Sequence, residues 1–183
     1  SDVLEAVTTW LAGAGLHVHF WLVDEEGNNV FDDGGNGGTE VMRQAVAGLL
    51  ETMQENALVF APHENSFRRL LPGAHAPSTV SWGYENRTAS IRLPGGGHKA
   101  RRIEHRVAGA DANPYLVLCS ILGGALLGIE NKWVPSAPIV GDAYSQDLLH
   151  LPYDWASAIE AFSRGRHVED IYSCLLYTSP SPR

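Results

Sequence analysis

The chain has 183 residues, of which 44% are hydrophobic and 19% charged, and its formal net charge is −8. This length and composition are typical of one globular domain with its own core. The acidic balance argues against a general nucleic-acid binder, and no apolar run approaches the roughly 20 residues of a membrane-spanning helix. With two cysteines and acidic first residues in place of a signal peptide, we expect a cytoplasmic protein without a disulfide framework.

The first third of the chain predicts one strand followed by helices. Residues 16–24 alternate in polarity and are rich in β-formers, which predicts a strand. The glycine-rich residues 32–38 predict a surface loop. Thr39 can cap a helix that continues to about residue 54, and a shorter helix is expected over residues 56–60.

The remainder predicts three more strands and two more helices. Residues 79–84 and 88–93 favour two strands joined by a short connection, and residues 102–107 favour a third. A long apolar helix is expected over residues 113–131, with proline at an early position where its missing N–H costs least. A last helix is expected over residues 153–162.

The arginines are concentrated in the middle of the chain. Seven of the eleven lie between Arg68 and Arg106, together with Lys99, and the only acids there are Glu85 and Glu104. This stretch therefore has a net charge of +6, and the rest of the chain carries −14. Because arginine pairs bidentately with carboxylates and phosphates, a cationic centre in an acidic protein predicts a site for nucleotide phosphates and a carboxylate substrate.

Two polar patterns within predicted strands are candidates for metal or anion binding. His17 and His19 share one face of a strand, where they suit a divalent metal, a phosphate or an ordinary structural pair. Arg102, Glu104 and Arg106 also share a face. They form either a surface ion-pair ladder or a carboxylate that holds a metal between arginines that hold anions, a mixture that phosphoryl transfer needs.

Five blocks of the chain resemble, in order and spacing, the C-terminal half of the catalytic domain of the glutamine synthetase superfamily. The blocks are residues 13–19 (GAGLHVH), 65–73 (NSFRRLLPG), 86–94 (NRTASIRLP), 100–106 (ARRIEHR) and 112–116 (ANPYL). Residues 80–88 (VSWGYENRT) look most like the γ-glutamylpolyamine synthetase branch. The resemblance implies an α+β fold with a curved, mainly antiparallel sheet backed by helices. We expect the strands at His17, Arg92 and Glu104 to lie in one sheet.

The same resemblance implies an ATP-dependent glutamate–amine ligase that uses Mg²⁺ or Mn²⁺. In that reaction the γ-carboxylate of glutamate is phosphorylated, and an amine then displaces phosphate from the acyl phosphate. The match would make His17 and Glu104 ligands of the metal. It would place Gly13, His17, Arg69 and Arg106 around the glutamate.

The nucleotide side of the site is also implied by the resemblance. His19, Arg87, Arg92 and Arg102 would bind ATP, with Arg87 placed to stabilise the transferring phosphoryl group. His75 stands where ammonia-using members carry a glutamate that helps to deprotonate ammonium. Since an imidazole offers no permanent negative charge, we favour a larger amine or polyamine as the acceptor and assign His75 to the catalytic loop. The alternative is that His75 is an ordinary loop residue.

Two other functions are kept open. One is glutamine synthetase proper, which uses ammonia, and the other is a non-catalytic relative that binds a nucleotide or glutamate for regulation. We expect residues 1–12 to be an unmatched lead-in, residues 13–172 to be the C-terminal part of the catalytic domain, and residues 173–183 to be a non-native tail. The glutamates that complete the metal sites would lie upstream, so this fragment alone should be inactive. The resemblance also implies a ring-shaped homo-oligomer in the full-length protein.

Overall fold

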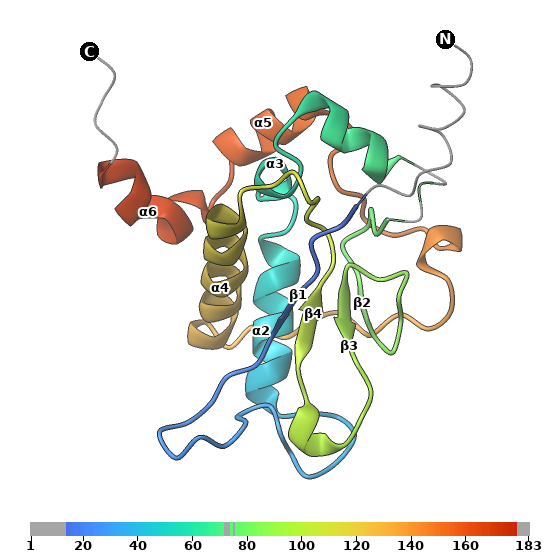
Figure 1. Ribbon diagram of the computed structural model, residues 1–183, viewed down its shortest axis with the longest axis vertical. Coiled ribbons are helices and arrows are strands. Elements are labelled where there is room, and N and C mark those ends of the chain that lie inside the picture. Colours follow the sequence, from blue (N-terminus) through green and yellow to red (C-terminus); the bar gives the residue numbers. More distant parts are fainter. Residues whose placement is uncertain (1–13, 72–73, 75, 179–183) are drawn as a thin grey trace.

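The centre of the fold is a small sheet whose strands come from distant parts of the sequence. A computed structural model describes residues 14–71, 74 and 76–178. The strands are β1 (Val18–Phe20), β2 (Trp82–Tyr84), β3 (Ile91–Leu93) and β4 (Ile103–His105), and their order is β1-β4-β3-β2. β4 is antiparallel to both of its neighbours, whereas β2 and β3 are parallel. The predicted α+β class with a mainly antiparallel sheet is confirmed (Figure 1).

The register of the sheet places the predicted polar residues side by side. His19 of β1 is opposite Glu104 of β4, and Glu104 is also opposite Arg92 of β3. A bridge between Gly15 and Gly109 continues the β1–β4 pairing past His17. The strand segments at these positions therefore meet in one sheet, as predicted.

The parallel pairing of β2 and β3 is the least expected part of the topology. Parallel neighbours ordinarily need a long crossover, but here residues 85–90 return the chain to the start of β2. Glu85 takes up the left-handed region, with φ of 56°, and its N–H donates to Leu93 O over 3.0 Å. β3 is shorter than predicted because residues 88–90 belong to this loop, and β2 is shorter because it begins at Trp82 and not at residue 79.

Two long helices pack against each other beside the sheet (Figure 1). α2 (Glu40–Glu51) begins at Thr39, whose hydroxyl accepts from Met42 N. α4 (Pro114–Glu130) begins at Asn113, whose side chain accepts from the first two free N–H groups. Both caps agree with the predicted helix starts. Both helices therefore begin where their side chains satisfy N–H groups that lack helical partners.

The remaining helices lie between or beside the sheet and the two long helices. They are α3 (Ala57–Phe60), η1 (Glu64–Leu70), η2 (His98–Ala100), η3 (Ala143–Ser145), α5 (Trp155–Ser163) and α6 (Val168–Thr178). α3 and α5 correspond to predicted helices. α6 was not predicted; it packs on α4 and reaches into residues 173–183, which were expected to be a tail.

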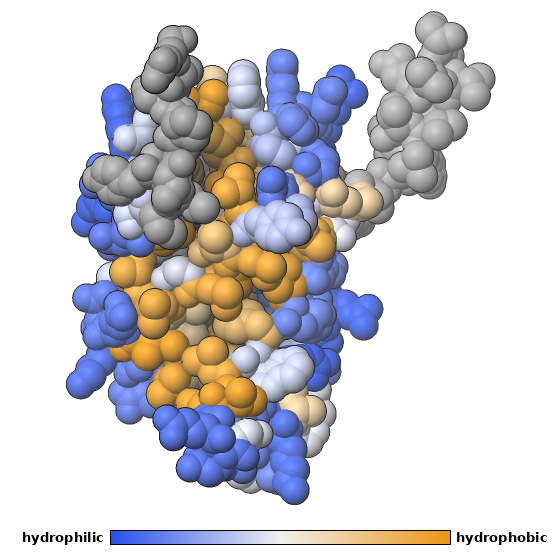
Figure 2. All heavy atoms as spheres, turned by 60° about the vertical axis from the view of Figure 1, so that its left-hand side comes forward, coloured by the Kyte–Doolittle hydropathy of each residue, from blue (hydrophilic) through white to orange (hydrophobic). Residues whose placement is uncertain are grey.

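Apolar side chains fill the space between sheet and helices and also cover one outer face. Met42, Ile91, Ile103 and Ile121 are fully buried in the core. Figure 2 brings the α4 side forward and shows apolar side chains gathered there. Three leucine side chains on the outer surface of α4 are exposed: Leu118, Leu122 and Leu126. Among the described residues, no helix is both long and apolar enough to cross a membrane.

Candidate functional site

Glu104, in the middle of β4, is the centre of the predicted site. The residue is only 4% exposed, although its side chain is a carboxylate. Its Oε2 accepts a hydrogen bond from Arg92 Nη1 over 2.9 Å, and its Oε1 lies 3.4 Å from Arg106 Nε. Arg92 comes from the neighbouring strand and Arg106 follows β4 itself, so the sheet register builds this contact.

Two histidines approach the same carboxylate from the β1 side. His17 Nδ1 lies 3.3 Å and His19 Nε2 lies 3.6 Å from Oε1 of Glu104. Arg102 Nε donates to His19 Nδ1 over 3.3 Å. Burial, followed by the charge of Arg106, lowers the pKa of His17 even though Glu104 opposes the shift. A neutral imidazole, which is the form that binds metals, is therefore favoured next to the carboxylate.

Glu104 stays ionised, and the positively charged side chains around it are more numerous than this one carboxylate. Burial favours its protonated form, but the hydrogen bond from Arg92 and the charge of Arg106 outweigh that effect and lower the pKa of Glu104. Among the described residues, the Nε atoms of Arg92 and Arg106 are buried and have no hydrogen-bond acceptor. One carboxylate thus faces two guanidinium groups with donors to spare, which suits the binding of further anions.

Arg69 and Arg87 complete the cluster from outside the sheet. Arg69, in η1, donates to the carbonyl of Val107, and its charge contributes to the lowered pKa of His17. Arg87 has an exposed side chain, and its carbonyl accepts from Arg106 Nη1. The structure therefore places four predicted residues against Glu104: His17, His19, Arg92 and Arg106. Three more adjoin these residues: Arg69, Arg87 and Arg102. Gly13 and His75 lie outside the described residues.

Two side chains near the cluster were not predicted. Glu85 lies 3.8 Å from Arg92 Nη2 and accepts from the N–H of Gly95. Tyr144 lies close enough for the charge of Arg106 to act on it, while burial is the main cause of the raised pKa of this tyrosine. Neither residue stands in a periodic pattern with the others, because Glu85 is in a tight loop and Tyr144 is in the short helix η3, away from the sheet sequence.

The donor set fits part of a coordination shell for a divalent ion. A carboxylate and a neutral imidazole are suitable ligands for Mn²⁺, and the carboxylate also suits Mg²⁺. In the part of the chain that the structure describes, no group of three or more His, Cys, Asp or Glu side chains is arranged to hold a metal ion. His17 and Glu104 can therefore supply two donors to a site that needs further ligands.

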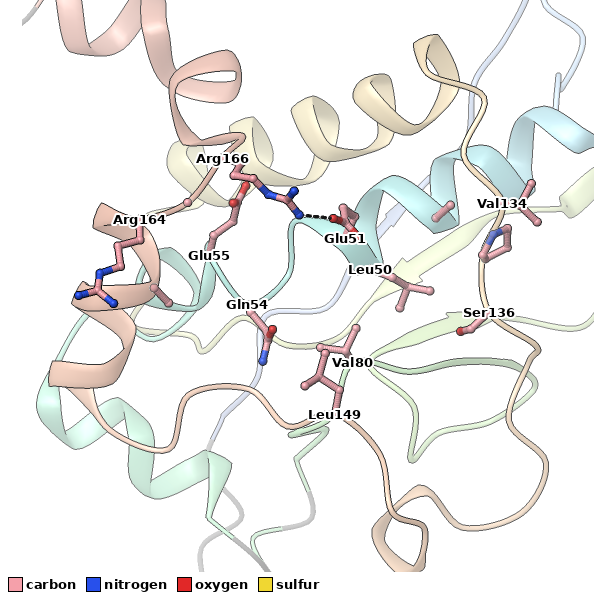
Figure 3. Close-up of a pocket in the computed structure, with 14 residues that line it drawn as sticks. Leu50, Glu51, Gln54, Glu55, Val80, Val134, Ser136, Leu149, Arg164 and Arg166 are labelled. Atoms are coloured by element: carbon pink, nitrogen blue, oxygen red, sulfur yellow. Dashed lines mark hydrogen bonds and ion pairs between the residues drawn. The ribbon is translucent and has the colours of Figure 1, made fainter.

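A pocket of about 510 Å³ lies elsewhere, between the end of α2, the segment after α4, and the α5–α6 junction (Figure 3). Leu50, Val80 and Leu149 form an apolar wall, and Arg166 Nη2 lies 3.3 Å from Glu51 Oε1. None of the described residues in the Glu104 cluster lines this pocket. The hollow is thus separate from the Glu104 cluster.

Comparison with known proteins identifies related sequences. The family described as "Glutamine synthetase, catalytic domain" matches residues 7–176. A γ-glutamylputrescine synthetase of Escherichia coli is 36% identical over 157 residues, which are 86% of this chain and 33% of the relative. A γ-glutamylethanolamide synthetase of Streptomyces coelicolor is 40% identical over 150 residues, 82% of this chain and 32% of the relative.

Solved structures show the same fold. A structure described as "Apo GmaS without ligand" aligns with a TM-score of 0.77 and 30% identity, and covers 87% of this chain and 37% of that protein. A second, described as "GmaS/ADP complex", aligns with a TM-score of 0.77 and 29% identity. The chain spans about a third of the length of the curated relatives above.

Proposed function

Because the chain belongs to the family of glutamine synthetase catalytic domains, we propose that it is part of an ATP-dependent ligase that joins glutamate to an amine. The observation that carries the proposal is the Glu104 cluster, in which one buried carboxylate and two histidines lie among several arginines. The activity is that of the whole protein, since this chain spans only about a third of its relatives.

The arginines divide between the two anionic substrates. Arg69 and Arg106 would hold the carboxylates of glutamate, and Gly13 and His17 would border the same substrate. His19, Arg92 and Arg102 would bind the phosphates of ATP. Arg87, whose side chain is exposed beside Arg106, would stabilise the phosphoryl group during transfer.

The reaction proceeds in two displacements. An oxygen of the γ-carboxylate attacks the terminal phosphorus of ATP, the bond to the bridging oxygen breaks, and ADP leaves. The amine nitrogen then attacks the acyl carbon, phosphate leaves with the carbon–oxygen bonding pair, and the amide nitrogen loses a proton. Fixed guanidinium charges favour the first step because negative charge is redistributed over the transferring group.

His17 and Glu104 would hold a divalent ion, Mg²⁺ or Mn²⁺, at the same place. Such an ion would supply positive charge to neutralise the phosphate oxygens. The lowered pKa of Glu104 keeps the carboxylate charged at neutral pH, and the lowered pKa of His17 keeps the imidazole neutral. Both groups are thereby in the form that binds a metal.

The acceptor is proposed to be an alkylamine or polyamine. The relatives described above are named for putrescine and ethanolamide products, and a further relative, 40% identical over 135 residues, is a glutamate–isopropylamine ligase of Pseudomonas. His75 in place of a carboxylate supports the same choice. Relatives named glutamine synthetase, such as that of Sulfolobus acidocaldarius at 38% identity, favour ammonia as the second candidate.

The assembled protein is proposed to be a ring-shaped homo-oligomer in the cytoplasm. Its exposed leucines on α4 support assembly, because folded proteins seldom leave broad apolar areas uncovered. Residues 173–183 are still proposed to be a non-native tail and residues 1–12 a lead-in, although the family match extends from residue 7 to residue 176.

The test is an activity assay of the full-length protein. Phosphate release with ATP and glutamate is measured with putrescine, ethanolamine, isopropylamine or ammonium, and each product is identified by mass spectrometry. We expect a γ-glutamyl amide with an organic amine. Ammonia as the best acceptor would support glutamine synthetase, while ATP binding without phosphate release would support a regulatory relative. The isolated 183-residue chain should release no phosphate in this assay.

A further inference from the structure

An irregular segment between α4 and α5 runs beside the edge strand β2. Ile139 N–H donates to the carbonyl of Trp82 over 2.9 Å. In return, the indole Nε1 of Trp82 donates to the carbonyl of Ser136 over 2.7 Å. Gly83 leaves room for this approach, because a Cβ at that position would be 2.9 Å from Ile139 O. The segment is therefore bound to β2 through backbone and side-chain hydrogen bonds.

The same segment continues to the loop after β2 and is bonded there by two side chains. Asn86 Nδ2 donates to the carbonyl of Gly141 over 2.7 Å. Thr88 Oγ1 accepts from Ala143 N–H over 2.9 Å. These bonds join positions that are 55 residues apart in the sequence, so neither is a local turn interaction.

Asn86 and Thr88 are also bonded to each other. Asn86 Oδ1 accepts from Thr88 N–H over 3.0 Å and from Thr88 Oγ1–H over 2.7 Å. A continuous chain therefore runs from Ala143 N–H through the threonine hydroxyl to the asparagine amide and on to Gly141 O. Every polar atom of the two side chains is used, which fixes their orientation as well as their position.

The residue between them is Arg87, the proposed phosphoryl-stabilising group. Its side chain forms no ion pair with a described residue, so its position depends on its backbone. That backbone is held from one side by Arg106, which donates to Arg87 O. From the other side it is held through the neighbouring Asn86 and Thr88.

Apolar packing does not replace these hydrogen bonds. A groove of about 490 Å³ lies between the loop and the segment, with Tyr84 to Arg87 on one side and Pro138 to Gly141 on the other. Because this groove separates the loop from the segment, the side-chain bonds of Asn86 and Thr88 are the direct polar links between the two at this level.

We propose that Asn86 and Thr88 are positioning residues that hold Arg87 at the site by bonding its loop to residues 138–143. This inference rests on the proposed function, in which Arg87 stabilises the transferring phosphoryl group. Arg87 is needed in the transition state more than for substrate binding. Loss of its positioning should therefore lower kcat more than it raises KM.

The test compares variants of the full-length protein. Thr88→Val keeps the shape of the side chain but removes the hydroxyl, whereas Thr88→Ser keeps the hydroxyl. Asn86→Ala removes the bond to Gly141, and Asn131→Ala is the control, because Asn131 also donates to a carbonyl but lies at the end of α4. The measurements are kcat, the KM for ATP and glutamate, and hydrogen exchange of peptides that cover residues 85–90 and 138–146.

We expect Asn86→Ala and Thr88→Val to lower kcat by roughly 10- to 100-fold, as a displacement of about 1 Å does. The KM values should change by less than about threefold. Both peptides should exchange faster, while Thr88→Ser and Asn131→Ala should behave as the unmodified protein. Unchanged exchange, or faster exchange with unchanged kcat, would overturn the proposal.

Failure of the proposed function is a separate result. If the unmodified protein releases no phosphate with any acceptor, the ligase proposal fails. Hydrogen exchange still decides whether Asn86 and Thr88 hold the Arg87 loop, since that readout does not require turnover.

Discussion

Arg92 and Glu104 face each other across the β3–β4 pair, and Arg92 Nη1 donates to Glu104 Oε2 over 2.9 Å. The contact is buried on the carboxylate side, where the exposed fraction is 4%. A buried charge needs such partners, because removal from water would otherwise favour the neutral form. The pair therefore keeps a charged oxygen ligand in the centre of a cationic site.

Glu104→Gln should nearly abolish turnover of the full-length protein. Glutamine keeps the size of the side chain but removes the charge, so Arg92 and Arg106 lose their counter-charge and the proposed metal loses a ligand. We expect kcat to fall by roughly 10²-fold or more, and the Mn²⁺ concentration for half-maximal activity to rise. Glu26→Gln, in an exposed turn, is the control. An unchanged Mn²⁺ requirement in Glu104→Gln would contradict the metal assignment.

Gly128→Ala should destabilise the fold even though alanine is the better helix former. The backbones of α2 and α4 are in contact at this point, and a Cβ on Gly128 would lie 2.6 Å from Gly48 N. Intrinsic helix preference favours alanine by up to about 1 kcal/mol, whereas overpacking against backbone costs roughly 1–3 kcal/mol or more. The thermal unfolding midpoint of Gly128→Ala should fall below that of the unmodified protein.

Gly123→Ala is the matched control on the same helix. Its Cβ would meet side-chain atoms of Ile171 at 3.0 and 3.1 Å, and a side chain can move. The expected loss is therefore smaller than for Gly128→Ala. Equal midpoints for the two variants would show that the close α2–α4 approach is not a constraint.

Tyr172 should give the fold an alkaline stability limit. Burial is the main cause that raises the pKa of Tyr172 to about 12, and its hydroxyl donates to Asn56 Oδ1 over 2.6 Å. Because the folded pKa is above the ordinary value of 10.0, the stabilisation is complete below about pH 10 and is lost as pH rises through 12. A rise of this size corresponds to roughly 2–3 kcal/mol.

The measurement is the thermal unfolding midpoint between pH 8 and 12. Tyr172→Phe should be less stable at pH 8, because Asn56 Oδ1 loses its hydrogen-bond donor. Between pH 10 and 12, however, its midpoint should fall less than that of the unmodified protein. Tyr115→Phe is the control, since that side chain is 79% exposed. Parallel curves for Tyr172→Phe and the unmodified protein would refute this role.

Local signals in the sequence were sufficient to predict the long helices. Thr39 and Asn113 cap α2 and α4 at the expected places, because an N-cap acts on N–H groups of the next turn. The strand over residues 16–24 was too long. Only Val18–Phe20 pairs with β4, since the chain then folds back on itself and Val30 N–H donates to Leu22 O.

The non-local features were not predictable from periodicity. Alternation shows which residues share a face but not the direction of a neighbouring strand, so the parallel β2–β3 pairing had no signal. The charge pattern indicated an anion site, and the family resemblance indicated which arginines belong to it. The bonds from Asn86 and Thr88 to residues 138–143 depend on how a long irregular segment folds back, which no local pattern specifies.

His75→Glu should change the preferred acceptor of the full-length protein. A carboxylate in this loop would attract ammonium and assist its deprotonation, whereas the histidine offers no permanent negative charge. General-base assistance is worth roughly 10²–10⁴-fold, so ammonia should be a poor substrate of the unmodified enzyme. The substitution should raise ammonia use more than polyamine use.

The assay for this prediction is phosphate release with ammonium and with putrescine, for both forms, between pH 6 and 9. The ratio of kcat/KM for the two acceptors is the decisive quantity, because a general loss of activity lowers both values together. His63→Glu, at an exposed position before η1, tests whether any added carboxylate has the same effect. Ammonia turnover equal to or better than putrescine turnover in the unmodified enzyme would contradict the proposed amine acceptor and favour glutamine synthetase as the function.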